Sequence, residues 1–224
     1  MNRRSTLLLF ALAGLAGCSA PGAAVPPASP SPGAAPDFGW PSRDPALSSG
    51  FCFTLVHGLA PAQVIEQLGG TELERVEWLR LVGGGDGEQG RTDRFFVGVA
   101  RIGEYSLIVE DNGALGVTQS LVSPLSEGGV VAGYRSDAAG RGRLLVLRDE
   151  DLVLDYDSAV PTRLGGSRPA EFQAALRAVG LVGDTTVTDP TRAALAFLSE
   201  QTGVPLTRDL LAERTYLLVT VPKM

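Results

Sequence analysis

The chain contains a single histidine, His57, so any catalytic triad or zinc site that needs an imidazole must include it. Cys52, the only cysteine of the predicted globular domain, lies five positions earlier in the same predicted strand. Side chains along a strand alternate between its two faces, so this odd separation predicts no local Cys-His dyad. We therefore interpret Cys52 as a buried small side chain. His57 is interpreted as a surface residue at the end of a strand, and it is kept as a weak ligand-site candidate.

Acidic and amide side chains mark two further candidate ligand sites. Asp155 and Asp157 share one face of a predicted strand. A calcium site would need about six to eight oxygen ligands, so a solvated strand face is the simpler interpretation of these two acids. Glu110 and Asn112 border a predicted turn, in which Gly113 is expected to take a positive φ and exposed polar groups could line a ligand site.

The sequence carries no motif of an assembled active site. It lacks the Gly-x-Ser-x-Gly nucleophile elbow and the His-Glu-x-x-His zinc motif. The glycine-rich run at 83–90 lacks the Gly-Lys-Ser/Thr ending of a phosphate loop, and it is interpreted as a flexible hairpin loop. We therefore predict no catalytic residue, no metal site, no cofactor and no enzymatic activity.

The first eighteen residues are similar to a bacterial lipoprotein signal. Arg3 and Arg4 precede an uncharged apolar stretch at 6–17, which is too short to cross a bilayer because a spanning helix needs about 20 residues. The stretch ends in LAGC, which resembles a lipobox and implies a diacylglycerol thioether on Cys18. We expect a signal peptide at 1–17, and a lipidated Cys18 followed by a proline- and alanine-rich tether at 18–36. The mature protein would be exported and held at the outer face of the cell membrane by palmitate-type acyl chains.

The charge balance bears on the class of partner. The chain has 19 basic and 25 acidic residues, and removal of the signal peptide leaves 17 basic against 25 acidic residues, a net charge of −8. Nucleic acid is an unsuitable partner for such a domain, because phosphate binding requires a basic patch. The negative charge also disfavours docking of the domain itself onto anionic lipid, which leaves the acyl anchor as the expected membrane contact.

Downstream of residue 36 the hydropathy pattern alternates between strands and helices. Strands are predicted at 51–57, 95–102, 105–110, 130–134, 143–147, 152–157 and 216–221, with a weak candidate at 76–82. Helices are predicted at 61–68, 169–179, 190–202 and 206–214, with a short irregular one at 117–125. Several hairpins with few crossover helices predict an α+β fold. It would be a single domain over 37–224, with a mainly antiparallel sheet of about six to seven strands and three to four packed helices.

Several short motifs resemble an actinobacterial family known as domain of unknown function 6461. The first is the stretch 51–61 (FCFTLVHGLAP), followed by Val64, Leu68 and Gly69. The others are Glu110, Asn112, Gly113 and Gly116; Pro161, Arg163, Gly165 and Pro169 with Phe172, Leu176 and Gly180; and Thr202, Gly203 and Val204. The resemblance covers most of 51–211. This chain departs from the family pattern at His57, where arginine is usual, and at Tyr105, where tryptophan is usual. The family has no assigned activity to carry over.

Three functions stay open at this point. The leading hypothesis is a membrane-tethered, non-enzymatic binding module whose partner is a protein or a cell-envelope component. The second is an immunity-type or inhibitor protein that neutralises a basic toxin or enzyme through a contiguous acidic face. The third is a hydrolase built around His57 or the clustered carboxylates, which an exposed His57 would argue against.

Overall fold

The computed structural model describes residues 35–83, 93–183 and 187–223. Residues 35–224 form one compact unit. The predicted signal peptide, Cys18 and the tether up to residue 34 lie outside the described residues, as does most of the glycine-rich run at 83–90. No helix in the described ranges is long and apolar enough to cross a membrane.

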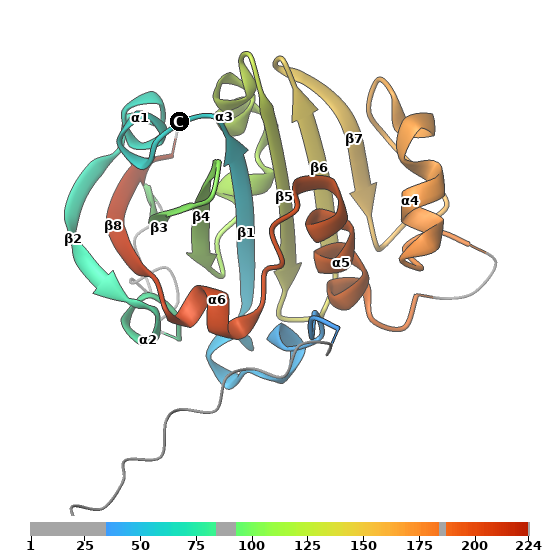
Figure 1. The fold of residues 1–224 in the computed structure, drawn as a ribbon, viewed down its shortest axis with the longest axis horizontal. Coiled ribbons are helices and arrows are strands. Elements are labelled where there is room, and N and C mark those ends of the chain that lie inside the picture. Colours follow the sequence, from blue (N-terminus) through green and yellow to red (C-terminus); the bar gives the residue numbers. More distant parts are fainter. Residues whose placement is uncertain (1–34, 84–92, 184–186, 224) are drawn as a thin grey trace, which may run out of the picture. The chain divides into compact units, whose positions relative to one another are not determined.

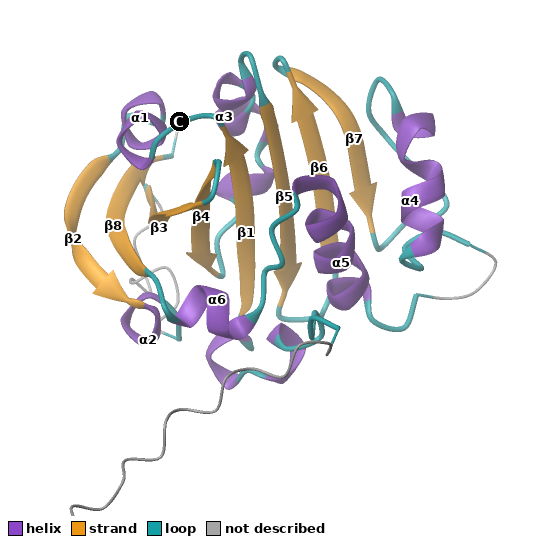
Figure 2. Cartoon of the chain, viewed as in Figure 1, coloured by secondary structure: helices purple, strands orange, loops and turns teal. Residues whose placement is uncertain are grey.

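The unit is built on one antiparallel sheet of eight strands in the order β2-β8-β3-β4-β1-β5-β6-β7 (Figures 1 and 2). The strands are β1 (Gly50–His57), β2 (Thr71–Glu77), β3 (Arg94–Ile102), β4 (Tyr105–Asp111), β5 (Val130–Asp137), β6 (Gly142–Arg148), β7 (Asp151–Asp157) and β8 (Thr215–Pro222). Every pairing is antiparallel. The class and the predominantly antiparallel sheet predicted from the sequence are therefore confirmed.

Six α-helices in the described residues cover the two faces of the sheet. They are α1 (Pro61–Gln67), α2 (Trp78–Leu81), α3 (Gln119–Val122), α4 (Gln173–Ala178), α5 (Pro190–Thr202) and α6 (Arg208–Ala212). Short 3-10 turns lie at Pro41–Arg43 and Pro45–Leu47 before β1, at Leu115–Val117 and Pro124–Ser126 on either side of α3, and at Pro169–Phe172 before α4. In Figure 1, α5 and α6 lie over the near face of the sheet, and α3 lies behind it.

The alternation of side chains along each strand divides the core into two clusters. In β1, Phe51, Phe53 and Leu55 belong to the larger cluster, which is completed by α2, α4, α5 and α6. Cys52 and Val56 face the smaller cluster, under α1, α3 and the turns around Leu115 and Leu125. Both clusters lie wholly within Trp40–Val221, so the unit starting at residue 35 contains its own hydrophobic core.

The numbers of strands and helices predicted from the sequence were too low. The weak strand candidate at 76–82 is in fact the end of β2 followed by the single-turn helix α2. Six of the seven β2 residues are exposed and only Val76 is buried, so this edge strand lacks the apolar alternation from which strands are recognised. The helix count rises from three or four to six because α2 and α3 are single turns of four residues each.

Candidate ligand-binding site

The Glu110 carboxylate is used inside the fold. Glu110 is the penultimate residue of β4 and is 1% exposed. Its Oε1 accepts a hydrogen bond from the backbone N–H of Leu115 at 2.9 Å, and its Oε2 accepts one from the N–H of Gly116 at 2.8 Å. These bonds satisfy two amides of a short 3-10 turn that has no strand to pair with. Glu110, which was a ligand-site candidate from the sequence, therefore stabilises the loop after β4.

The turn after β4 differs from the prediction in one respect. Asn112, and not Gly113, has the positive φ, at 61°. Asparagine tolerates this left-handed conformation better than most residues, so it can occupy the position without glycine. Gly113 is required for a different reason: a Cβ there would lie 2.0 Å from Oε1 of Glu110. The assignment of the positive φ to Gly113 was wrong, and close approach explains this glycine.

Cys52 lies beside Glu110 on the same face of the sheet. It is fully buried and pairs in register with Glu110 on one side and Arg135 on the other. Burial raises the pKa of the Cys52 thiol well above its ordinary value, and the Glu110 carboxylate raises that pKa further. Arg135 donates from Nε to the carbonyl oxygen of Gly113 at 2.8 Å and so also serves the turn. A thiol in these surroundings stays protonated and is a poor nucleophile.

His57 lies at the end of β1, five residues from Cys52 with no register shift between them. Its side chain is exposed and packs edge-on against the Tyr105 ring, with centroids 5.1 Å apart. The strand is regular, so the imidazole and the thiol lie on opposite faces of the sheet. The structure does not bring the two together.

Asp155 and Asp157 are bound separately. Asp155 accepts two hydrogen bonds from Arg143, at 3.0 Å from Nε and 2.9 Å from the second guanidinium nitrogen, and this bond raises the pKa of Arg143. Exposed Asp157 accepts the backbone N–H of Ala159 at 2.8 Å. Among the described residues no group of three or more His, Cys, Asp or Glu side chains could hold a metal ion. Asp155 is therefore held in a bidentate ion pair, and Asp157 stabilises the turn that follows β7.

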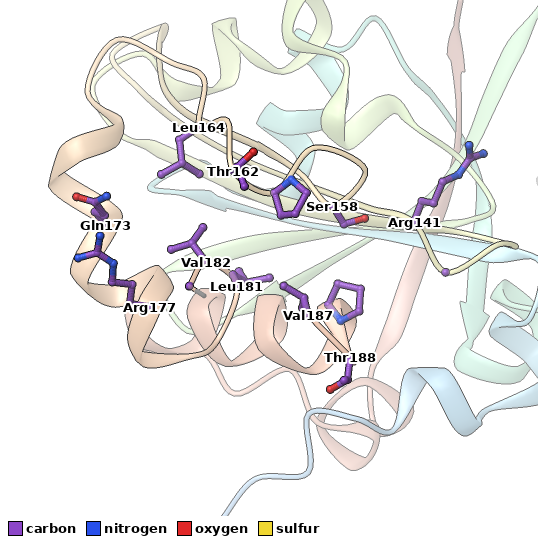
Figure 3. A pocket seen from close by; sticks show the side chains of 14 residues that line it. Arg141, Ser158, Thr162, Leu164, Gln173, Arg177, Leu181, Val182, Val187 and Thr188 are labelled. Atoms are coloured by element: carbon purple, nitrogen blue, oxygen red, sulfur yellow. The ribbon is translucent and has the colours of Figure 1, made fainter. Parts of the chain in front are cut away.

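A surface pocket of about 740 Å³ lies elsewhere, at the β7 side of the sheet; we call it the α4 pocket (Figure 3). Its walls come from the tip of the β5–β6 hairpin, the loop after β7, helix α4, the segment after α4, and the start of α5. The lining residues are Gly140, Arg141, Ser158, Pro161, Thr162, Leu164, Gln173, Arg177, Leu181, Val182, Gly183, Val187, Thr188 and Pro190. Its volume lies within the range of about 300–1,000 Å³ typical of small-molecule sites.

The loop that forms one wall of the α4 pocket is attached to the sheet edge. Gly165 exchanges two backbone hydrogen bonds with Asp155 of β7, at 2.8 and 3.0 Å. The next residue, Gly166, has φ 100°, and a Cβ there would lie 2.6 Å from the backbone of Val153. A side chain at this position would push the loop off β7. The glycine therefore lets the 161–164 segment stand as a fixed wall over the edge strand.

The opposite wall is formed by α4 and the start of α5. Buried Phe172 and Leu176 hold α4 against the larger core cluster. Asp189 caps α5 by accepting the backbone N–H of Arg192 at 2.9 Å, and Pro190 occupies the first helical position. This wall is therefore anchored in the core, whereas the loop wall is attached to the edge strand β7.

The chemistry of the α4 pocket is apolar at its centre and cationic at one end. Leucine, valine and proline side chains line the centre. Gln173 and Arg177 lie one helical turn apart on α4 with their head groups at one end, whereas the Arg141 guanidinium points away from the apolar side chains (Figure 3). Arg141 is paired with Asp137, from its Nε at 2.8 Å. Neither Gln173 nor Arg177 makes a side-chain hydrogen bond or ion pair with any other described residue.

The residues of the α4 pocket were not among the sequence-based site candidates. The signals that touched it were Pro161 in one family motif, the helix pattern that starts at Pro169 and the predicted helix start at Pro190. The pocket arises when segments from Gly140 to Pro190 meet, and no local pattern records that meeting. Cys18, the remaining candidate, lies outside the described residues.

The chain matches the family described as "Family of unknown function (DUF6461)" over residues 32–224. The protein belongs to this family. The match confirms the resemblance and extends it beyond 51–211 to the turns around Trp40 and to β8. No curated protein and no solved structure matched the chain.

Proposed function

We propose that this member of the DUF6461 family is a non-enzymatic binding module that takes its ligand in the α4 pocket. The observation that carries the proposal is the composition of that pocket. Its lining contains leucine, valine, proline, threonine, serine, glutamine and arginine, but no Asp, Glu, His, Cys, Lys or Tyr among the described residues. General acid–base catalysis draws on those missing types, so the pocket is equipped to bind rather than to move protons.

The hydroxyl groups of the pocket do not change this interpretation. Ser158 accepts the backbone N–H of Gly142 at 2.7 Å, so its oxygen already serves the β6 strand. A serine or threonine nucleophile needs an adjacent base, and the described lining offers none. The hydrolase hypothesis centred on His57 loses support for a related reason, because His57 is exposed and no acid is bonded to it in the described residues.

The inhibitor hypothesis finds less support than the binding module. It rests on a contiguous acidic face, yet the acids around β7 are interleaved with arginines. Arg143 binds Asp155 at 2.9 Å, and Arg168 approaches both Asp151 at 3.8 Å and Glu171 at 3.6 Å. A surface that neutralises its own acids offers little attraction to a basic partner.

The proposal includes the membrane anchor. A lipid on Cys18 would hold the module at the outer face of the cell membrane, and the 18–36 segment would set its distance from the headgroups. The partner would then be a protein or a cell-envelope component within reach of that tether.

Nuclear magnetic resonance on residues 35–224 with a small-molecule fragment library tests the proposal. We expect fragment-induced shifts to cluster on the amides of Thr162, Leu164 and Arg177. Thr162→Trp fills the pocket from an exposed loop position and should abolish these shifts. Thr71→Trp, at an exposed position on the opposite edge strand β2, should leave them intact. Fragments that cluster elsewhere, or that bind Thr162→Trp as well as the wild type, would refute the α4 pocket as the binding site.

A further inference from the structure

We infer that the α4 pocket selects ligands that join a carboxylate to a branched aliphatic body. This inference rests on the proposed binding function and names the chemistry of the ligand. The aliphatic body would lie on the apolar centre, and the carboxylate would lie between Gln173 and Arg177.

The apolar part of the inference follows from the shape of the pocket. Leu164 lies on the loop wall, Leu181 and Val182 on the segment after α4, and Val187 before α5, and Figure 3 shows their side chains gathered around one space. Leu181 is fully buried, whereas Leu164, Val182 and Val187 are only partly covered. A ligand that covers these three side chains removes apolar surface from water, which favours binding by about 25 cal/mol per Å².

The anionic part follows from the pairing of the arginines. The chain has 18 arginines. Several of those near the α4 pocket form ion pairs within the fold, including Arg141 with Asp137 and Arg143 with Asp155. Arg177 has no acidic partner among the described residues and has no acid in the described pocket lining. Its planar guanidinium can bind a carboxylate with two parallel hydrogen bonds, a geometry that the ammonium group of a lysine does not offer.

Gln173 supplies the second contact. It lies four residues before Arg177 on α4, so the two side chains share one helix face. Its amide can donate one hydrogen bond to a carboxylate and accept another from a neighbouring N–H group, such as that of a peptide unit. An apolar carboxylate could therefore come from a peptide C-terminus or from a small branched acid.

Titration of four probes by nuclear magnetic resonance tests the inference. N-acetyl-leucine and N-acetyl-leucinamide share one aliphatic body and differ in the charged group. We expect the acid to bind about three- to tenfold more tightly than the amide, a fold-change that corresponds to the net contribution of one ordinary hydrogen bond. The pair 4-methylpentanoate and 4-methylpentanamide repeats the comparison without a peptide unit. A preference for the acid in both pairs assigns the selectivity to the carboxylate alone, and a preference only in the first pair assigns it to a peptide C-terminus.

Arg177→Gln removes the charge and keeps a polar side chain, so it should abolish the preference for the acid over the amide. Arg75→Gln is the matched control, because Arg75 is exposed on β2 at the far edge of the sheet and has no ion pair in the described residues. Equal affinity for the acid and amide probes, measured from the backbone N–H shifts of the pocket residues, would overturn the inference. The proposed binding function would not be affected by that result. Failure of all four probes to shift those amides would overturn the inference too, while the fragment mapping would still decide the proposed function.

Discussion

The carboxylate of Glu110 reaches across its own turn and accepts a hydrogen bond from the backbone N–H of Gly116 at 2.8 Å. Gly116 is there because a Cβ at its position would lie 1.9 Å from Oγ1 of Thr54 on β1. The backbone of the 3-10 turn can therefore approach the sheet closely enough for a buried acid to bind it. Two family-motif residues are thus explained by one packing arrangement.

We expect Glu110→Gln to lower the free energy of unfolding by about 1 to 3 kcal/mol. The new side chain can accept from one of the two bound amides but presents its own N–H₂ group to the other. Glu104→Gln is the control, because the Glu104 side chain is 83% exposed in the β3–β4 turn and should change stability by less than about 0.5 kcal/mol. Urea unfolding followed by tryptophan fluorescence gives both values. Equal stability of the two variants would return Glu110 to the ligand-site candidates.

We expect Gly113→Ala to lower the melting temperature by several degrees. The added Cβ meets the Glu110 carboxylate, and overpacking of this kind costs about 1–3 kcal/mol, where 1 kcal/mol corresponds to about 2–4 °C. Gly183→Ala is the matched control, since nothing lies within 4 Å of the Cβ position there and its φ is unremarkable. Circular dichroism during heating measures both. If Gly113→Ala and Gly183→Ala melt together, the close approach is wrong.

Asn112 provides the complementary test of backbone conformation. With φ at 61°, Asn112→Gly should retain or slightly raise the melting temperature, whereas Asn112→Val should lower it, because a β-branched side chain is disfavoured in the left-handed region by about 1–2 kcal/mol. The opposite order of these two variants would show that Asn112 does not hold the positive φ.

The elements that the sequence predicted well are those with strong local signals. The Gly103-Glu104 connection predicted the β3–β4 hairpin, and Asp189 with Pro190 predicted the start of α5. Most of strand β2 was missed, and only its end fell within the weak candidate at 76–82, because most of its residues face solvent and leave no pattern of period two. The positive φ was assigned to Gly113 from the propensity of glycine alone. Asparagine also adopts this conformation readily, and Asn112 takes it instead.

The candidate site was beyond local prediction for a different reason. The candidate residues expected in strands lie in those strands, and the separation of Cys52 from His57 followed from the alternation of side chains along β1. The α4 pocket depends on Gly166 allowing a loop to lie against Val153, a contact between segments that sequence periodicity does not encode. Arg177 becomes notable only once the described residues that line the α4 pocket are known to lack an acid.

The lipoprotein prediction concerns Cys18. Cys18→Ala should stop incorporation of labelled palmitate into the protein in a bacterial host, because the predicted lipobox makes this thiol the expected acceptor of the diacylglycerol group. The control is Cys52→Ala, which leaves the predicted lipobox unchanged and removes only a buried thiol. Undiminished labelling of Cys18→Ala would refute the lipid anchor.

Cys52 should be inert in the folded protein. Burial and the adjacent Glu110 raise the pKa of its thiol, and the thiolate is the reactive form. In residues 35–224, where Cys52 is the sole cysteine, we expect no iodoacetamide adduct by mass spectrometry at mildly alkaline pH. Complete modification should follow unfolding in guanidinium. Rapid labelling of the native protein would instead indicate an accessible, activated thiol.

Removal of the Cys52 sulfur should matter for packing alone. Cys52→Ala should cost about 0.5 to 2 kcal/mol of stability, the usual range for trimming a small buried side chain. Fragment shifts at the α4 pocket should be unchanged, because Cys52 faces the smaller cluster on the other side of the sheet from α4. Loss of those shifts in a stably folded variant would tie the thiol to the site.

The four tyrosines give the fold an alkaline limit. Burial raises the pKa of Tyr105, Tyr134, Tyr156 and Tyr216 above the ordinary value of 10.0, and that of Tyr134 to about 12. Above about pH 10 the unfolded chain releases these protons while the folded chain retains them. The stabilisation is therefore complete below about pH 10 and is lost as the pH rises toward 12, at about 1.4 kcal/mol per pH unit for Tyr134.

Ultraviolet absorbance of tyrosinate, recorded beside circular dichroism, checks this limit. We expect tyrosinate to appear together with loss of the native dichroism signal, and not before it. Tyr134→Phe should flatten the alkaline loss of stability by one titrating group, although it also removes the hydrogen bond to Thr191 at 3.1 Å and so lowers stability at neutral pH by about 1 kcal/mol. Tyr105→Phe is the comparison, because Tyr105 is half-buried at the sheet surface and its hydroxyl makes no hydrogen bond to another described residue. Formation of several tyrosinates near pH 10 in a protein that is still folded would contradict the buried environment of these side chains.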